Sequence, residues 1–407
     1  PLVFEDLVIV GSRIPDRVQR KFETPGAVQA FDTNTGERRW IFYTIPQSSD
    51  AYGADTWEDD SWEYTGHANV WGLMSLDEDR GLLYVPTSTP SSDYWGGRRL
   101  GANLFAESLL CLNARTGERE WHFQAVHHGL WDYDFASAPN LIDITVDGRQ
   151  IKAVVQITKQ GFTFVFDRAT GEPVWPIEER PVPQSGSPGE RTSRTQPFPT
   201  RPPAFDRQGA TEDNLIDFTP ELRAEAIAIA SRYVTGPMFT PPSIRGDGPN
   251  DTRGTIQLPG SQGGADVQGG AFDPETGMYY AVAHTLPRIV RISKGDDPDS
   301  EMEYWGDMDW SQDGGDDPAI DGLPITKPPW GRITAIDMNT GDHAWMAANG
   351  DALGDHPALE GLDLPPLGIS SRPAALVTKS LLFLGDGGHV FGGIYSNMWG
   401  NNFRAYD

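Results

Sequence analysis

One motif recurs four times along the chain: a hydrophobic strand, then Asp or Asn, a Thr-Gly turn and a closing Trp. The Asp or Asn side chain can cap such a turn, and Gly accepts the positive φ that the turn requires. The Trp opens the next strand with a large apolar ring, so each copy is predicted to be a β-hairpin with a packing plug. The copies are AFDTNTGERRW (30–40), CLNARTGEREW (111–121), VFDRATGEPVW (165–175) and AIDMNTGDHAW (335–345).

A second hairpin type alternates with the first, as SLDEDRGLLYVPT (75–87) and AFDPETGMYYAVA (271–283). Amphipathic helical periods are nearly absent, and the chain is rich in turn formers, with 45 Gly and 33 Pro. These features favour an all-β fold made of many short strands. Hairpins that return at intervals of one blade are typical of radial repetition, so we predict a β-propeller.

The largest insertion between these hairpins is Pro-rich and covers about residues 176–253. It contains one predicted helix, from Thr219 to about Val234, with Thr219 as N-cap, Pro220 at the first helical position and Gly236 at the stop. Such an excursion usually covers a face of a propeller or contacts a neighbour. We therefore expect residues 1–407 to form a single propeller domain that carries this insertion.

The formal net charge of -26 argues against a nucleic-acid partner, because such proteins need a basic face. The one cysteine, Cys111, cannot form an intrachain disulfide and is predicted to be a small buried hydrophobe. No apolar run reaches the roughly 18 residues needed to cross a bilayer. We expect membrane contact only through segments outside this sequence, both ends of which read as cut from a longer chain.

The motifs together resemble the pyrroloquinoline-quinone (PQQ) dependent dehydrogenases, the quinoproteins of the methanol and membrane glucose dehydrogenase group. The resemblance covers essentially the whole chain, and the segments HHGLWDYD and TKQG are closer to the glucose branch. Besides the Trp-plugged hairpins, it is carried by GHANVWG (66–72) with VPTSTP (85–90), VHHGLWDYD (126–134), ITKQGFTFVFDRATG (157–171), and LPPLG (364–368) with LVTKSLLFLGDG (376–387).

The resemblance implies an eight-bladed propeller of which about five to six blades are present here. It also implies PQQ near the central axis, stacked on a Trp, and a Ca²⁺ or Mg²⁺ ion that touches the quinone. Enzymes of this family act in the periplasm and pass electrons to ubiquinone or a cytochrome.

Asp132 resembles the family's catalytic carboxylate, and Lys159 resembles the basic residue that bonds the quinone oxygens. Oxidation of a hydroxyl needs a base for the proton while hydride leaves carbon, and a cation stabilises the charge that develops on the quinone. The alternatives are a turn-capping Asp in a scaffold propeller and an exposed turn lysine. His127 and His128 are neighbours in the chain, so we favour a structural or substrate-edge role for them over metal ligation.

Trp71 matches the aromatic on which PQQ stacks, although a Trp in a propeller can also be a blade plug. Thr89 follows 18 residues later, where methanol-type enzymes have a metal-ligating Asn. Asn69 lies two residues before Trp71 and is a secondary candidate for a PQQ contact.

Three more candidates come from the family pattern. Asp16 resembles its acidic metal ligand, and Ser12 lies where a PQQ carboxylate or carbonyl is bonded. Arg17 replaces the Asn of the glucose-type pattern, and ADVQGG (265–270) replaces an Asn-Trp-Gly-Gly type segment, which leaves Gln268 as a polar candidate near the cofactor.

We therefore expect a periplasmic PQQ-dependent dehydrogenase that oxidises a sugar, polyol or alcohol hydroxyl. The expected site has Asp132 and Lys159 in catalysis, Trp71, Lys159, Ser12, Asn69 and Gln268 at the cofactor, and Asp16, Asp132 and Thr89 at the metal. Two alternatives stay open: a non-catalytic propeller scaffold of the outer-membrane assembly type, and a truncated quinoprotein that cannot hold PQQ.

Overall fold

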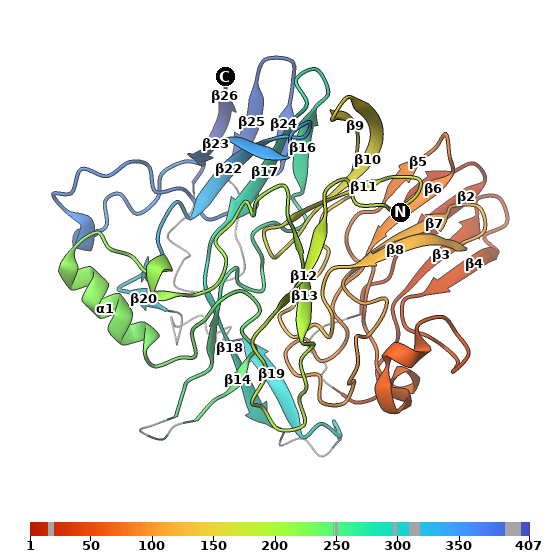
Figure 1. Cartoon of the computed structure of the whole chain (residues 1–407), viewed down its shortest axis with the longest axis horizontal. Coiled ribbons are helices and arrows are strands. Elements are labelled where there is room, and N and C mark those ends of the chain that lie inside the picture. Colours follow the sequence, from red (N-terminus) through yellow and green to blue (C-terminus); the bar gives the residue numbers. More distant parts are fainter. Residues whose placement is uncertain (15–19, 247, 249–250, 296–298, 309–317, 387–399) are drawn as a thin grey trace.

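The computed structural model describes residues 1–14, 20–246, 248, 251–295, 299–308, 318–386 and 400–407. Antiparallel sheets dominate these residues, and several are arranged side by side (Figure 1). The first sheet has the order β1(Leu2–Phe4), β2(Leu7–Val10), β3(Ala27–Asp32) and β4(Arg38–Tyr43). The second has the order β5(Ser75–Asp77), β6(Leu82–Pro86), β7(Ser108–Asn113) and β8(Arg119–Gln124).

The next sheets follow the same antiparallel pattern. One pairs β9(Asn140–Val146), β10(Arg149–Ile157) and β11(Thr163–Asp167). Another has the order β16(Gly270–Asp273), β17(Met278–His284), β22(Gly331–Asp337) and β23(Asp342–Ala348). A last one pairs β24(Ala375–Val377), β25(Leu382–Gly385) and β26(Phe403–Tyr406).

A further sheet is irregular, because β14(Ser243–Ile244) joins it in parallel to β18(Arg288–Lys294). β18 also pairs with β15(Thr255–Gln257) and β19(Tyr304–Met308). Two small ribbons complete the strands: β12(Ile177–Pro181) with β13(Thr195–Pro199), and β20(Ala319–Ile320) with β21(Leu323–Pro324). Short 3-10 turns occur at η1(Ala54–Thr56), η2(Glu58–Glu63), η3(Glu212–Asn214) and η4(Pro357–Leu359).

The Thr-Gly turns form as predicted. In the first copy, Oδ1 of Asp32 accepts hydrogen bonds from the amides of Asn34 and Thr35 at 2.8 and 2.9 Å. Gly36 takes a φ of 73°, in the left-handed region that favours glycine. The same carboxylate or amide cap recurs at Asn113, Asp167 and Asp337.

In the first three copies, the Trp packs on the turn glycine of the next copy. A Cβ at Gly117 would lie 2.6 Å from the indole of Trp40. A Cβ at Gly171 would lie equally close, at 2.6 Å, to the indole of Trp121. Trp40 also donates from Nε1 to the carbonyl of Ala114 at 3.1 Å. The plug is thus confirmed for the first three copies, whereas Trp345 of the fourth copy is 42% exposed.

Alternate residues of single strands face opposite neighbours. In β6, Leu83 belongs to the core shared with the first sheet, whereas Tyr84 belongs to the core shared with β10 and β11. The inner strands are therefore buried on both faces, which explains their continuous hydrophobic sequences. Cys111 is buried in the second of these cores, as predicted. This face-to-face packing of successive sheets confirms the propeller class, while the number of blades stays a prediction.

The insertion carries the predicted helix, α1(Pro220–Ala230), at one edge of the molecule (Figure 1). Thr219 caps it by accepting from the amide of Leu222 at 3.2 Å. The helix ends four residues before the predicted Val234, because Val234 bridges to Thr255, the first residue of β15. Among the described residues, no helix is both long and apolar enough to cross a membrane.

Candidate active site

Asp132 lies in the connection between β8 and β9, in a tightly turned segment. Its φ is 53°, and that of His128 is 52°, so both adopt the left-handed region that L-residues rarely occupy. The flanking rings of Trp131 and Tyr133 are each 1% exposed, whereas the side chain of Asp132 is 21% exposed. The carboxylate is therefore the reachable group within an otherwise buried segment.

Lys159 follows β10 and joins the same site from another sheet. Its Nζ donates to Oδ1 and to the carbonyl oxygen of Asp132, both at 2.9 Å, and to Oδ2 of Asp134 at 3.2 Å. An ammonium group has three N–H donors, so these acceptors satisfy all of them. The predicted pair of Asp132 and Lys159 is thus in direct contact in the structure.

Trp71 joins this network through Asp134. Its Nε1 donates to Oδ2 of Asp134 at 3.0 Å, and Nζ of Lys159 lies 5.9 Å from the centre of its ring. The half-buried indole is therefore held by its edge beside the lysine. Asp134, two residues after Asp132, was missed from the sequence, although the spacing Asp-Tyr-Asp would have drawn attention to it.

Thr89 connects Asp134 to a buried acid, Glu107. Its hydroxyl oxygen lies 3.0 Å from Oδ1 of Asp134 and 2.9 Å from Oε1 of Glu107. A hydroxyl has one proton to donate, so one of the two carboxyl groups must donate to it. Burial raises the pKa of Glu107 to about 8, which identifies Glu107 as the protonated donor. The side chain of Thr89 thus contacts Asp134 and Glu107.

The two aspartates of the site differ in their proton affinity. Burial raises the pKa of Asp132 well above its usual range, although Lys159 opposes this. Burial acts in the same direction on Asp134, but Lys159 and the amide of Thr89 outweigh it and lower the pKa of that carboxyl. Asp134 is therefore a permanent anion, whereas Asp132 can accept a proton. The pKa of Lys159 is raised by both carboxylates despite burial, so the lysine stays charged.

Tyr94 contacts the second oxygen of Asp132 and was not predicted. Its hydroxyl lies 3.3 Å from Oδ2 of Asp132, and its side chain is buried. Burial and the nearby Asp132 raise the pKa of Tyr94 well above its usual value, so the phenol stays protonated and can donate. The carboxylate of Asp132 is thus contacted from both sides, by Lys159 and by Tyr94.

The other predicted cofactor residues are bonded within the protein. Ser12 accepts from the amide of Ala27 at 2.9 Å. Asn69 bonds both backbone groups of Ile14, each at 3.2 Å. Gln268 accepts from the amide of Asp266 at 3.1 Å. Their contacts with a cofactor stay predictions.

The predicted metal set is only partly visible. Asp16 and its neighbour Arg17 lie outside the described residues. The structure does not bring the hydroxyl of Thr89 to Asp132, because it contacts the carboxyl groups of Asp134 and Glu107. Within the described ranges, no group of three or more His, Cys, Asp and Glu side chains could hold a metal ion. The metal ligands therefore stay a prediction.

Polar side chains near Lys159 lack partners for some of their buried donor atoms. Arg372 pairs with Asp266 at 2.7 Å, yet its Nε has no partner among the described residues. The same holds for Nε2 of Gln262, whose neighbour Gly263 lies against Lys159. Buried donors without partners are costly, so these two atoms point to an acceptor that the described part of the chain does not supply.

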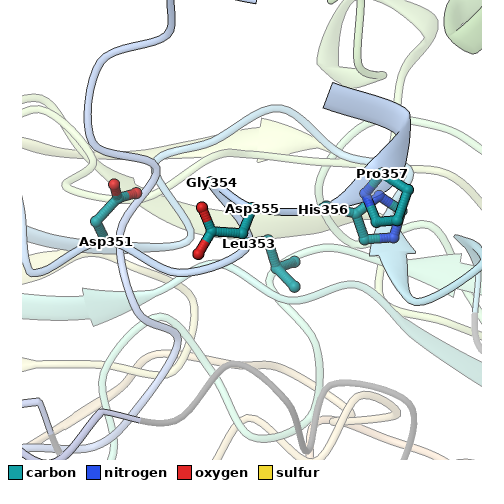
Figure 2. A pocket seen from close by; sticks show the side chains of 6 residues that line it. All are labelled: Asp351, Leu353, Gly354, Asp355, His356 and Pro357. Carbon is teal, nitrogen blue, oxygen red and sulfur yellow. The ribbon is translucent and has the colours of Figure 1, made fainter. Parts of the chain in front are cut away.

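A separate cavity of about 430 Å³ lies in the connection between β23 and β24 (Figure 2). Its lining includes the carboxylates of Asp351 and Asp355 and the imidazole of His356. His356 uses its ring nitrogens for the carbonyl of Asp321 and the amide of Ala358. None of the residues predicted for the active site lines this cavity.

All 407 residues match the family described as the PQQ glucose/ethanol/alcohol dehydrogenase β-propeller domain. The chain belongs to this family. It is 33% identical over 387 residues to the quinoprotein glucose dehydrogenase of Gluconobacter oxydans (strain 621H), an alignment that covers 86% of this chain and 44% of the relative. It is 31% identical over 421 residues to the glycerol dehydrogenase large subunit of Gluconobacter thailandicus, which covers 95% of this chain and 54% of that protein.

The fold agrees with the same family. A europium-containing methanol dehydrogenase superposes with a TM-score of 0.60 at 21% identity, over 95% of this chain and 56% of that one. At this identity the likeness supports the fold alone. The chain spans about half the length of the relatives that it matches.

Proposed function

We propose that the chain is the catalytic propeller of a PQQ-dependent dehydrogenase that oxidises a hydroxyl of a sugar or polyol. The observation that carries the proposal is the network of Asp132, Lys159, Asp134 and Trp71, which come from three separate sequence segments. A propeller scaffold has no need to gather a buried lysine, two carboxylates and an indole at one point. The relatives named for glucose and glycerol favour sugars and polyols over simple alcohols.

The residues of the site fit PQQ, an aromatic ortho-quinone with three carboxylates. The half-buried indole of Trp71 offers a face for stacking, and Nζ of Lys159 lies over the ring at 5.9 Å from its centre. The unpartnered donors Nε of Arg372 and Nε2 of Gln262 suit carboxylate or quinone oxygens. Trp71, Lys159, Arg372 and Gln262 would therefore hold the cofactor, which supplies a hydride acceptor when it is bound.

The protein's own residues would manage the proton and the charge. Asp132 is the base that takes the hydroxyl proton, because its pKa is raised and its side chain is 21% exposed between two buried rings. Lys159 orients Asp132 through Oδ1, and its fixed charge stabilises negative charge that develops nearby. Asp134 is the permanent anion that holds Lys159 in place.

The finer parts of the proposal come from the family. A Ca²⁺ or Mg²⁺ ion would take Asp132 and Asp16 as ligands, with the backbone carbonyl of Thr89 as a third. Ubiquinone or a cytochrome would accept the electrons, and the protein would act in the periplasm. Each of these is the family's usual arrangement and is proposed for this chain on that basis.

Cofactor reconstitution tests the proposal. The protein is titrated with PQQ in the presence of Ca²⁺ or Mg²⁺ and followed by quinone absorbance. Dye reduction is then measured with aldoses, polyols and primary alcohols. We expect saturable PQQ binding and substrate-dependent dye reduction. Binding without turnover on any substrate would contradict the proposed activity. Binding only by a chain extended to full length would favour the truncated quinoprotein, and no binding by the extended chain would favour the scaffold.

A further inference from the structure

The insertion at about 176–253 contacts the segment that carries Asp132. Gln196 bonds both backbone groups of His127, accepting from the amide at 2.8 Å and donating to the carbonyl at 2.7 Å. Trp131 donates from its indole to the carbonyl of Thr240 at 2.9 Å. Phe239 packs against the Trp131 ring at 5.1 Å between centroids. The insertion thus forms the outer wall of the segment His127–Tyr133.

Glu190 is the buried charged residue of this wall. Its side chain is 0% exposed, although it comes from a loop rich in Pro, Gly and Ser. Oε1 lies 2.5 Å from Nε2 of His128, and Oε2 accepts from the amide of Gly96 at 2.5 Å. Both oxygens of one carboxylate are therefore used on two different segments of the propeller.

The contact between Glu190 and His128 is a short, buried hydrogen bond. Nδ1 of His128 lies 2.9 Å from the carbonyl of Gly101, which can only accept, so Nδ1 carries a proton. Burial acts to raise the pKa of Glu190, but His128, the amide of Gly96 and the nearby Arg99 lower it below its usual value. A single proton therefore joins Nε2 of His128 to Oε1 of Glu190 across 2.5 Å.

Both segments bonded to Glu190 contact the carboxylate of Asp132 or contain it. His128 lies four residues before Asp132, with a left-handed backbone at both positions. Gly96 lies two residues after Tyr94, whose hydroxyl is 3.3 Å from Oδ2 of Asp132. The two segments touch closely, because a Cβ at Gly96 would lie 2.8 Å from the His128 ring.

Arg99 reinforces the same junction without taking part in the pair. It is 1% exposed and donates to the carbonyls of Ser91, Ser92 and Gly129 at 3.0, 2.7 and 2.7 Å. These bonds fasten the loop before Tyr94 to the segment before Asp132. Glu190 ties both segments of this junction to the insertion through one carboxylate.

We propose that Glu190 is a positioning residue, through which the insertion fixes the base Asp132 by way of His128 and Gly96. The proposal rests on the proposed function, since it takes Asp132 to be the base. Glu190 touches neither substrate nor cofactor. Its effect is on the geometry of the carboxylate, and small displacements of a base cost rate rather than binding.

The test is Glu190→Gln in the PQQ-loaded protein, which keeps the side-chain shape and removes the charge. We expect kcat to fall about 10- to 100-fold, while KM and the Kd for PQQ change by less than about threefold. Hydrogen exchange should rise in the amides of residues 126–134 and stay unchanged in the strands of the first sheet. The matched control is Glu179→Gln, which removes a carboxylate 3.0 Å from His127 that is 51% exposed, and should leave kcat and exchange unchanged.

Several results would overturn the proposal. They are an unchanged kcat in Glu190→Gln, an equal loss of kcat in Glu190→Gln and Glu179→Gln, or a rise in the Kd for PQQ that accounts for the lower rate. If Glu190→Gln does not fold, Glu190→Asp keeps the charge and shortens the side chain, and should give the same fall in kcat and the same rise in hydrogen exchange. If neither variant folds, Glu190 serves stability alone and the proposal fails. A wild-type protein that binds no PQQ or turns over no substrate counts against the proposed function instead, and the exchange measurement still tests the contact.

Discussion

Lys159 places one ammonium group against the carboxylates of Asp132 and Asp134, so its removal is a sharp test of the site's electrostatics. Lys159→Met keeps an unbranched side chain of similar length and deletes the charge. Nζ donates three hydrogen bonds, at 2.9, 2.9 and 3.2 Å. The side chains of Lys159, Asp132 and Asp134 are 5%, 21% and 10% exposed, so water can replace few of these hydrogen bonds.

Removing one partner of a buried ion pair costs about 3–5 kcal/mol, because a charge is left without compensation. We expect the lower end of this range for Lys159→Met, since Asp132 is partly exposed and one carboxyl can take up a proton. The free energy of unfolding should therefore fall by about 3 kcal/mol at neutral pH. Lys379→Met is the matched control, because Lys379 pairs with Glu275 at 3.8 Å while 82% exposed, and it should change stability by less than about 0.5 kcal/mol.

The loss of stability in Lys159→Met should grow as pH rises. Without Nζ, burial holds the pKa of the two carboxyls above their unfolded values of about 4. When a carboxyl has a higher pKa in the folded protein than in the unfolded chain, the protein loses stability as pH rises between these two pKa values. Urea denaturation should thus show a larger deficit at pH 8 than at pH 5. A deficit below about 1 kcal/mol at pH 8, or one that does not vary with pH, would refute the reasoning.

Three further predictions concern single side chains. Glu107→Gln should equal the wild type in stability near pH 4.5 and become the more stable protein as pH rises to 8, because the pKa of Glu107 is raised to about 8 and its charged form is buried. The gain is at most about 1.4 kcal/mol per pH unit. Guanidinium denaturation across this pH range measures the difference, and a difference that does not vary with pH would contradict the prediction. Gly117→Ala should cost about 1–3 kcal/mol more than Gly148→Ala in thermal unfolding, since both have a left-handed φ but only Gly117 lies against Trp40; equal costs would argue against the docking contact. Trp71→Ala should raise the Kd for PQQ about tenfold with little change in melting temperature, and an unchanged Kd would remove Trp71 from the cofactor site.

The parts of the fold that the sequence predicts are those with local causes. The Asp-capped turn at 32–36 needs only residues that are neighbours in the chain, and its bonds form as expected. The cap of α1 at Thr219 is equally local. The end of α1 was wrong because Val234 pairs with Thr255, a contact that no nearby stop signal reveals.

The site divides in the same way. Asp132 and Lys159 could be named from the family resemblance, and the structure brings them together. Tyr94 and Glu107 could not, since each joins the site through contacts with residues 38 and 18 positions away. Glu190 lies 62 residues from His128 in a loop of Pro, Gly and Ser, where a single carboxylate gives no sign that it is buried.

The most direct test of the central claim is the rate at which substrate reduces bound PQQ in Asp132→Asn, measured by stopped-flow absorbance in a single turnover. The asparagine keeps the shape of the side chain and cannot take the hydroxyl proton. We predict an unchanged Kd for PQQ and a reduction rate lower by about 10²- to 10⁴-fold. A reduction rate close to that of the wild type, with PQQ fully bound, would contradict the role of Asp132 as the base.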